Sequence, residues 1–187
     1  PYEAQILRAV GFIKNADAVI IGAGAVIHKD IPSNSIVVSK EELIIKERPQ
    51  LEHHVFTLTA SDTLENLTYL VENLPEVSFH IAAKTNVSDR LEAFKKYDNV
   101  TLYTNVHHDD IIEDLLDQAE IYLDINHWDQ VDSIVDRAFE KGKPVFAFDN
   151  VAHRAELGGS IFSNQNPEMM VEEIQRRLFG HAVDTLN

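Results

Sequence analysis

The sequence contains no cysteine, which excludes disulfide bonds, thiolate metal sites and a cysteine nucleophile. It also has few basic residues, because 16 lysines and arginines stand against 31 aspartates and glutamates, for a formal net charge of -15. A domain this acidic repels phosphate backbones at long range. We therefore expect neither nucleic acid nor an anionic membrane as a partner.

Long apolar runs are missing as well. The longest, residues 18–27, has ten residues, whereas a helix that crosses a bilayer needs about 20, so no membrane span is predicted. The opening Pro1-Tyr-Glu-Ala4 has neither the basic start nor the apolar stretch of a secretory signal. Because an initiator methionine is missing too, we expect the chain to be a piece of a longer or processed protein.

Three common catalytic motifs are also absent: the Gly-x-x-x-x-Gly-Lys-Ser/Thr loop, the His-Glu-x-x-His helix and the Gly-x-Ser-x-Gly elbow. Their absence argues against the usual nucleotidases, zinc proteases and serine hydrolases. What is present is an ordinary globular composition, with 44% hydrophobic and 25% charged residues in 187 positions. A chain of this length can bury one good core and a partial second one.

The clearest unit occupies residues 121–148 and has the pattern of a strand, a helix and a second strand. Apolar residues alternate over 121–125 and then recur at helical spacing over 131–139, until Gly142 ends the helix ahead of another apolar strand. A right-handed crossover of this kind places Asn126-His-Trp-Asp129 at the carboxyl end of the first strand. Open α/β sheets bind their ligands at that edge.

The same alternation begins near residue 53 and continues to the last predicted helix. Strands are also predicted at 55–59, 77–83 and 100–103, and helices after Ser61, after Ser88, at 109–118 and after Pro167. Five strands that alternate with helices predict an α/β fold, a doubly wound, mostly parallel, Rossmann-like sheet. We assign residues 51–187 to this domain.

Residues 1–50 have a different pattern, with helical spacing over 2–14 and β character after it, and can belong to a preceding domain. Residues 21–38 resemble the last coil of a hexapeptide-repeat acyltransferase, but no further six-residue repeats flank them. Residues 17–24 resemble the opening of a dinucleotide-binding or sirtuin-type fold, but the third glycine that opens a helix in the dinucleotide motif is missing. A plain strand with glycines at close backbone approaches is the third interpretation. The boundary is predicted near Pro49.

The candidate site is predicted from the loops that follow the strands. Polar side chains stand there just before helices, where free N–H groups favour an anion such as a diphosphate. The strongest constellation is Asp124, Asn126, His127 and Asp129, and Lys84 and Asn105 follow two neighbouring strands. A competing interpretation is that Asn126 or Asp129 only caps a helix while His127 is solvated. We predict a polar crevice lined by Lys84, Asn105, Asn126, His127 and Asp129.

Other histidines have structural interpretations. His107-His-Asp-Asp110 invites a metal site, but neighbours at a helix start point about 100° apart, and aspartates suit the positive end of a helix. We therefore predict no metal site there. His80 is expected to be a hydrogen-bonded histidine of the sheet, and His53-His54 to be linker residues. Serines and threonines of the strand-end loops are expected to cap helices.

The order of elements is similar to the carboxyl-terminal half of a GT-B glycosyltransferase, in which two such domains face each other and the second binds the nucleotide-sugar donor. In retaining members with a Glu-x7-Glu motif, that motif runs into Glu-Ala-Met-Ala-x-Gly-x-Pro-Val. Here Arg137-Ala-Phe-Glu-Lys-Gly-Lys-Pro-Val145 occupies the same place, but Asp129 and Arg137 stand where the two glutamates would fall. A guanidinium cannot accept hydrogen bonds from sugar hydroxyls. The resemblance therefore implies an altered donor site.

Residues 74–83, 97–103 and 121–127 resemble the stabilising subunit of the protein O-N-acetylglucosaminyltransferase that serves the accessory Sec system of Gram-positive bacteria. That family implies a cytoplasmic protein that pairs with a catalytic glycosyltransferase subunit and holds a serine-rich acceptor protein without transferring sugar itself. It implies no cofactor beyond a UDP-sugar donor.

Three hypotheses follow. The first is a glycosyltransferase-like accessory domain that binds a nucleotide-sugar or a glycosylated peptide. The second is an active UDP-sugar-dependent transferase in which Asp129 holds sugar hydroxyls. The third is an acyltransferase remnant at residues 17–38 fused to an unrelated α/β module.

Overall fold

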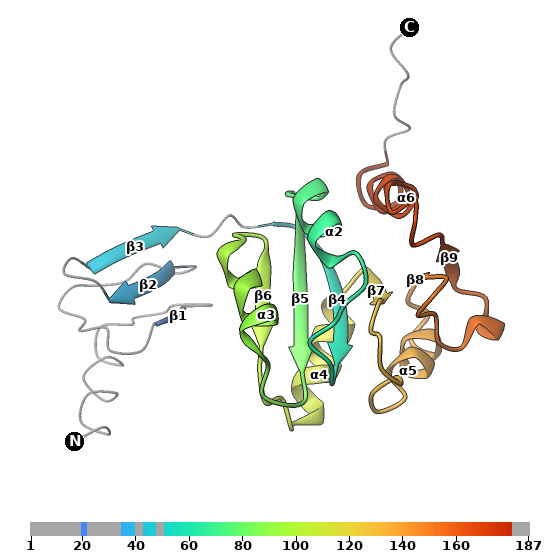
Figure 1. Cartoon of the computed structure of the whole chain (residues 1–187), viewed down its shortest axis with the longest axis horizontal. Helices are drawn as coiled ribbons and strands as arrows, with labels where there is room; N and C mark the ends of the chain where they lie inside the picture. Colours follow the sequence, from blue (N-terminus) through green and yellow to red (C-terminus); the bar gives the residue numbers. More distant parts are fainter. Residues whose placement is uncertain (1–19, 22–34, 40–42, 48–50, 181–187) are drawn as a thin grey trace, which may run out of the picture. The chain divides into compact units, whose positions relative to one another are not determined.

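The structure is a computed structural model that describes residues 20–21, 35–39, 43–47 and 51–180. The chain divides into two compact units, Pro1–Gln50 and Leu51–Asn187. Figure 1 shows the elements of both, coloured along the sequence.

The described residues of the first unit form three short strands. They are β1 (Ile20–Ile21), β2 (Ser35–Ser39) and β3 (Leu43–Glu47). β1 pairs with β2 in parallel, and β2 pairs with β3 in an antiparallel register that sets Val37 opposite Ile45. The strand expected at the end of residues 21–38 is therefore confirmed. β3 comes from the stretch before Pro49, and the predicted helix over 2–14 and the glycines of 22–24 lie outside the described residues.

The second unit is built on one six-stranded sheet whose strands all run in parallel. Its order is β6-β5-β4-β7-β8-β9. The strands are β4 (His53–Thr59), β5 (Val77–Ala83), β6 (Val100–Tyr103), β7 (Ile121–Asp124), β8 (Val145–Phe148) and β9 (Ser160–Phe162). This is the doubly wound order, so the predicted fold class is confirmed. The sequence predicted five strands and missed β9, because three residues are too few to show an alternation.

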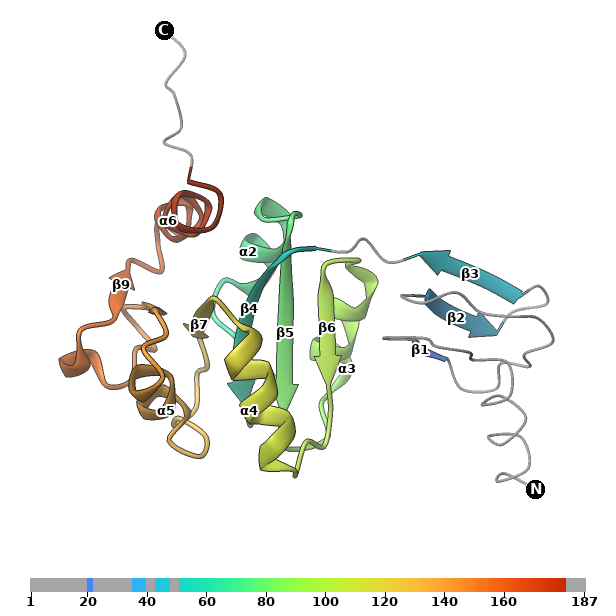
Figure 2. The same ribbon diagram turned by 180° about the vertical axis from the view of Figure 1, so that it is seen from behind.

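Helices cover both faces of this sheet, as the two opposite views show (Figures 1 and 2). α2, α3 and α6 lie on one face, and α4 and α5 on the other. Their bounds are α2 (Leu67–Asn73), α3 (Asp89–Glu92), α4 (Asp109–Gln118), α5 (Ile134–Glu140) and α6 (Glu168–Phe179), with short 3-10 turns η1 (Ala93–Lys96) and η2 (Ala155–Leu157). No described helix is long and apolar enough to cross a membrane.

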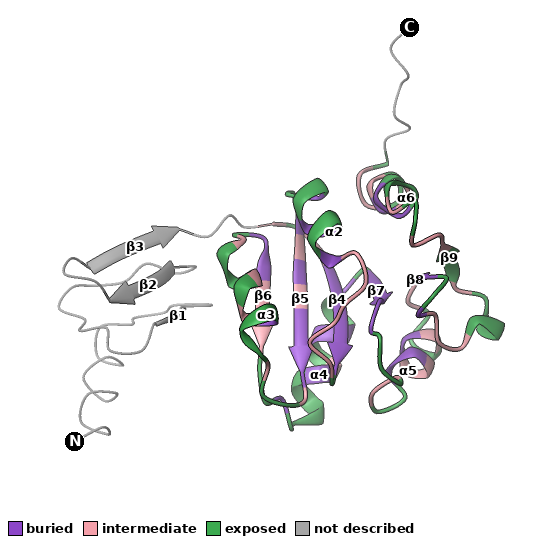
Figure 3. Cartoon of the chain, viewed as in Figure 1, coloured by how far each residue is buried: buried purple, intermediate pink, exposed green. Residues whose placement is uncertain are grey.

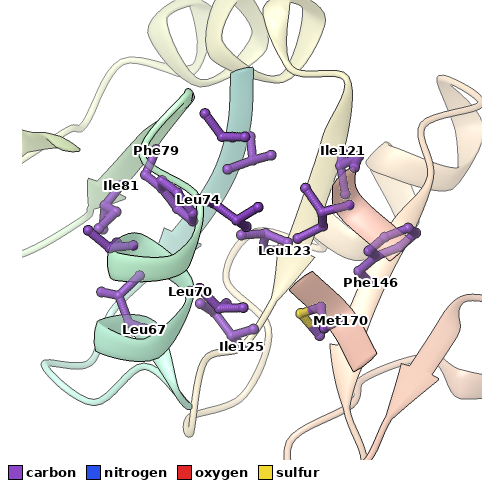
Figure 4. Close-up of a cluster of buried hydrophobic side chains, with 14 of the residues drawn as sticks. Leu67, Leu70, Leu74, Phe79, Ile81, Ile121, Leu123, Ile125, Phe146 and Met170 are labelled. Atoms are coloured by element: carbon purple, nitrogen blue, oxygen red, sulfur yellow. The ribbon is translucent and has the colours of Figure 1, made fainter. Parts of the chain in front are cut away.

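Two hydrophobic clusters hold these layers together. The cluster under α2 and α6 brings Leu70, Leu123, Phe146 and Met170 together from four elements (Figure 4). The second cluster packs α4 and α5 on the other face of β4 and β7. Figure 3 shows the central strands buried and the outer faces of the helices exposed. Each fully buried large side chain contributes about 1.5–3 kcal/mol to this packing.

The starts of α4 and α3 agree with the sequence predictions, whereas the start of α2 does not. α4 begins with Asp109 and Asp110 in its first turn, and Ser88 accepts a hydrogen bond from the Arg90 N–H at the start of α3, as predicted. The prediction of a helix directly after Ser61 was wrong. α2 begins only at Leu67, and Ser61 Oγ instead accepts from the Thr63 N–H at 3.0 Å.

α5 also begins later than predicted, at Ile134 rather than 131. Asp132 and Ser133 ahead of it both have left-handed backbone conformations, with φ of 50° and 51°. Such conformations interrupt an α-helix, since they lie outside its narrow φ range. Residues 131–133, which were predicted to be helical, therefore belong to the loop that follows β7.

Candidate functional site

The site lies where the strand order reverses, between β4 and β7. The loops that follow these two strands are joined by a short antiparallel bridge between Leu64 and Asn126. The Glu65 N–H donates to the Ile125 carbonyl at 2.7 Å, and the His127 N–H donates to the Thr63 carbonyl at 3.3 Å. The loops therefore form one connected surface at the carboxyl edge of the sheet.

Asn126 holds the second of these loops in place. Its side chain is 3% exposed, and its Oδ1 accepts from the buried Thr59 hydroxyl at 2.9 Å. Its Nδ2 donates to the carbonyls of Trp128 and Asp129 at 3.1 and 3.2 Å. A buried amide without partners would cost free energy, so these bonds fix the turn over 126–129. Asn126 thus orients the exposed residues that follow it.

His127 belongs to a polar cluster that comes from three separate segments. Its Nε2 lies 2.5 Å from Oε2 of Glu65, a residue that precedes α2. Asn150, which follows β8, donates from Nδ2 to the same Glu65 oxygen at 2.8 Å. Glu65 is 17% exposed and His127 is 36% exposed, so the imidazole borders solvent while its carboxylate partner is half-buried.

Asp124 and His153 form a second histidine–carboxylate pair beside the first. His153 Nδ1 lies 2.7 Å from Asp124 Oδ1, and the His153 N–H donates to Asp124 Oδ2 at 2.6 Å. Burial raises the pKa of the Asp124 carboxyl, against the opposing effect of the His153 N–H and ring. An ionised carboxylate in this position is costly without such partners. The pair anchors the loop after β8 to the end of β7.

Both nearby cations are neutralised by carboxylates. Lys84, at the end of β5, is ion-paired with Asp132 and lies 3.7 Å from a carboxylate oxygen of Asp109. Arg154, after β8, is ion-paired with Asp136 and with Glu156, and the hydrogen bond that its guanidinium donates to Glu156 raises the pKa of Arg154. A diphosphate at this edge would have to compete with these carboxylates.

A family profile described as the GftB/GlyA-F C-terminal domain matches residues 55–183. The chain belongs to this family. The predicted resemblance to the stabilising subunit is therefore confirmed, and residues 51–180 form a GT-B-type, glycosyltransferase-like domain.

Named relatives agree with this assignment. The chain is 36% identical over 152 residues to "Glycosyltransferase GlyF" of Streptococcus pneumoniae, which covers 80% of this chain and 38% of the relative. It is 42% identical over 128 residues to "UDP-N-acetylglucosamine--peptide N-acetylglucosaminyltransferase stabilizing protein GtfB" of Streptococcus agalactiae, covering 67% of this chain and 28% of the relative. The chain thus spans little more than a third of these relatives at most.

A solved structure has the same fold. "Crystal structure of GtfA/B complex bound to UDP and GlcNAc" superposes with a TM-score of 0.62 at 35% identity, covering 69% of this chain and 29% of that one. An α/β sheet of GT-B type is therefore shown for this GftB/GlyA-F C-terminal domain.

The five predicted site residues of this family member are not all gathered together. Lys84, Asn126 and His127 are linked, because the Lys84 N–H donates to the carbonyl of Thr59, whose hydroxyl bonds to Asn126. Asp129 is exposed on the loop that Asn126 fixes. Asn105 follows β6 and donates from its amide to Asn86 at 2.7 Å, so it belongs to the outer part of the edge.

Arg137 does not face the strand ends. On α5 it is ion-paired with Glu113 of α4, and Lys141 Nζ lies 2.7 Å from the same glutamate. Lys141 and then Arg137 hold the pKa of the Glu113 carboxyl below its usual range. The residue at the second glutamate position of the Glu-x7-Glu pattern therefore ties two helices together.

The sequence analysis did not predict three residues of the candidate site: Glu65, Asn150 and His153. Asn150 and His153 lie in a strand-end loop that follows β8, so their location was a usable signal. Nothing in the sequence pairs Glu65 with His127, because the two are far apart along the chain.

The predictions for the other histidines had different outcomes. His80 is a half-buried sheet histidine whose Nδ1 lies 3.0 Å from the Tyr103 hydroxyl, as predicted. The prediction that His53 and His54 are linker residues was wrong. Both lie in β4, where His53 is ion-paired with Glu120 and His54 Nδ1 lies 3.0 Å from His80 Nε2. In the part of the chain that the structure describes, no group of three or more potential metal ligands is found.

Proposed function

We propose that residues 51–187 are one half of a two-domain GT-B cleft, in an accessory subunit of a bacterial protein O-glycosylation system. In this proposal the half binds a nucleotide-sugar or a glycosylated peptide and does not itself transfer sugar. The observation that carries it is Arg137, which stands where a retaining transferase has a carboxylate and is ion-paired with Glu113. A guanidinium cannot accept the hydrogen bonds of sugar hydroxyls.

The relatives support the accessory role. The GtfB proteins are named as stabilising proteins of a peptide N-acetylglucosaminyltransferase, and the GtfA/B structure is a complex. By analogy, the partners proposed here are a catalytic glycosyltransferase subunit and a serine-rich acceptor protein. The accessory Sec system and the cytoplasm are the proposed setting.

Charge at the strand ends supports the same conclusion. Lys84 and Arg154 are the cations that could approach a diphosphate, and both are already paired with carboxylates. Exposed Asp129 is instead an acceptor suited to hydroxyl groups, whereas Glu65 already accepts from Asn150 and is paired with His127. The edge therefore favours the sugar part of a ligand over its phosphates.

Each predicted site residue has a proposed role. His127 and Asp129 contact sugar hydroxyls, Lys84 approaches the phosphates when a donor is present, and Asn126 holds the loop that carries His127 and Asp129. Asn105 contacts the outer end of the ligand.

An active UDP-sugar-dependent transferase is the second candidate. Two observations favour it: a relative is named "Glycosyltransferase GlyF", and Asp129, at the first position of the Glu-x7-Glu pattern, is exposed. Asp129 would then hold sugar hydroxyls in the donor site.

Calorimetry with UDP, UDP-GlcNAc and UDP-glucose separates the two candidates. An active donor site requires micromolar binding that His127→Ala or Lys84→Ala weakens at least tenfold, about 1.4 kcal/mol. The accessory proposal expects much weaker nucleotide binding. It also expects that co-expression with a GtfA-type catalytic subunit raises the yield and melting temperature of that subunit. An unchanged yield and melting temperature would refute the accessory proposal.

A further inference from the structure

A hollow lies between α2 and the segment α3–η1 on one face of the sheet. Figures 1 and 2 show these two elements on the same side of β5. Its volume is about 600 Å³, within the roughly 300–1,000 Å³ typical of small-ligand sites. Asp62, Leu64 and Asn66 of the loop after β4 line one end of it, so that end reaches the carboxyl edge of the sheet. None of the five predicted site residues lines it.

Aromatic rings form the walls of this groove. Tyr69 on α2 is 37% exposed, and the half-buried rings of Phe94 and Tyr97 pack together with centroids 5.8 Å apart. The Tyr97 hydroxyl donates to Glu72 at 2.5 Å, which fixes its ring across the groove. Buried Leu67 and Leu91 lie beneath the groove. Lys96 Nζ lies 4.7 Å from the centroid of the Tyr97 ring, so the exposed ring of Tyr69 is the aromatic face most open to a ligand.

The charges of the groove balance. Two acidic residues, Asp62 and Glu72, and two basic residues, Arg90 and Lys96, line it, although the whole chain carries a formal charge of -15. A balanced lining attracts neither a polyanion nor a polycation. The groove therefore suits a neutral ligand with both polar and apolar surface.

Polar groups for such a ligand are available. Asp62 Oδ1 accepts from the Ser88 N–H at 2.9 Å, which orients the carboxylate. Within residues 51–180, neither Asp62 Oδ2 nor the exposed guanidinium of Arg90 has a hydrogen-bond or ion-pair partner. One acceptor and one forked donor thus stand beside the aromatic wall, an arrangement that matches vicinal hydroxyls.

We propose that this groove binds a neutral oligosaccharide. The apolar C–H face of a sugar ring packs on Tyr69, and its hydroxyls bond to Asp62 and Arg90. Aromatic-lined grooves also bind extended peptides, so an unglycosylated peptide is the competing occupant, which the experiment below distinguishes. The inference goes beyond the proposed function, since it requires no binding at the strand ends.

Titration of the 187-residue chain with N,N′-diacetylchitobiose and with maltotriose, followed by NMR, tests this inference. We expect Tyr69→Ala to weaken binding roughly three- to tenfold, Arg90→Gln to weaken it too, and Tyr69→Phe to retain most of it. Ile111→Ala is the matched control, since Ile111 is an exposed side chain of α4 on the opposite face.

Three results would overturn the inference. One is no binding of either saccharide up to roughly 10 mM, far weaker than functional sites usually require. Another is binding that His127→Ala abolishes and Tyr69→Ala leaves intact, which places the sugar at the strand ends and supports only the proposed function. The third is tighter, Tyr69-dependent binding of an unglycosylated serine-rich peptide. Loss of UDP binding alone would bear on the proposed function and not on this groove.

Discussion

The His153 imidazole and the Asp124 carboxylate meet at 2.7 Å, and the His153 N–H donates to the second oxygen of the same carboxylate. Asp124 is 2% exposed and ends β7, whereas His153 lies in the loop after β8. Asn150 of the same loop bonds to Glu65. One loop is therefore fixed to two neighbouring segments at the edge where the site lies.

Asp124→Asn is predicted to change how stability depends on pH. Because burial raises the folded pKa of Asp124, the wild type loses stability as pH rises from the unfolded value, about 3.9, through the folded one. The variant lacks this loss, so its free energy of unfolding should improve relative to the wild type over that window and then level off. Urea unfolding at several pH values measures it. A free energy of unfolding that falls for the variant relative to the wild type as pH rises through this window would contradict the assignment.

Asn99→Ala is predicted to cost about 1–3 kcal/mol of stability. Asn99 is 8% exposed, and its amide donates to the carbonyls of Val71 and Leu74 at the end of α2. The substitution leaves both acceptors buried without this donor. Urea unfolding should show the loss, whereas Asn73→Ala, which removes an exposed bond to Tyr69, should change stability by no more than about 0.5 kcal/mol.

Arg137→Glu restores a carboxylate at the position of the second glutamate, and we expect it to destabilise the domain by about 1 kcal/mol. The new side chain would face Glu113, the present partner of Arg137. In a Glu113→Gln background most of that cost should vanish, and a double-mutant cycle measures the coupling. Equal costs in both backgrounds would mean that the pair contributes no stability.

Asp132→Asn is predicted to strengthen UDP binding roughly two- to fivefold, because it releases the Lys84 ammonium from its ion pair. The backbone tolerates the change, since Asp132 has φ of 50° and asparagine adopts that conformation readily. Calorimetry on the single variant and on Lys84→Gln/Asp132→Asn tests the prediction. A gain that persists without the lysine would refute the mechanism.

Periodicity predicted the regular part of this fold well. The pattern over 121–125 and the helical spacing after Pro167 correspond to β7 and α6. The spacing of α6 reflects burial of one face, whereas all four residues of β7 are buried. Element starts were less predictable. Ser61 looks like a helix cap, but the residues between it and α2 are used in the bridge to the loop after β7, and this tertiary pairing outcompetes local helix formation.

The candidate site shows the same limit. Lys84, Asn126 and His127 were predicted because they follow strands, yet the role of Asn126 depends on Thr59, 67 positions away. A strand-end residue is recognisable locally, but its partner is not. Glu65 and His153 became site residues only through contacts between distant segments.

The sequence by itself determined the layers of this protein, because alternating and helical spacing state which faces are buried, and it also determined the family through residues 74–127. Only the tertiary structure decided the chemistry of the carboxyl edge. There, parallel strands bring loops from distant positions together, and the ion pairs formed across them neutralise Lys84 and Arg154, leaving a surface whose acceptors suit hydroxyl groups.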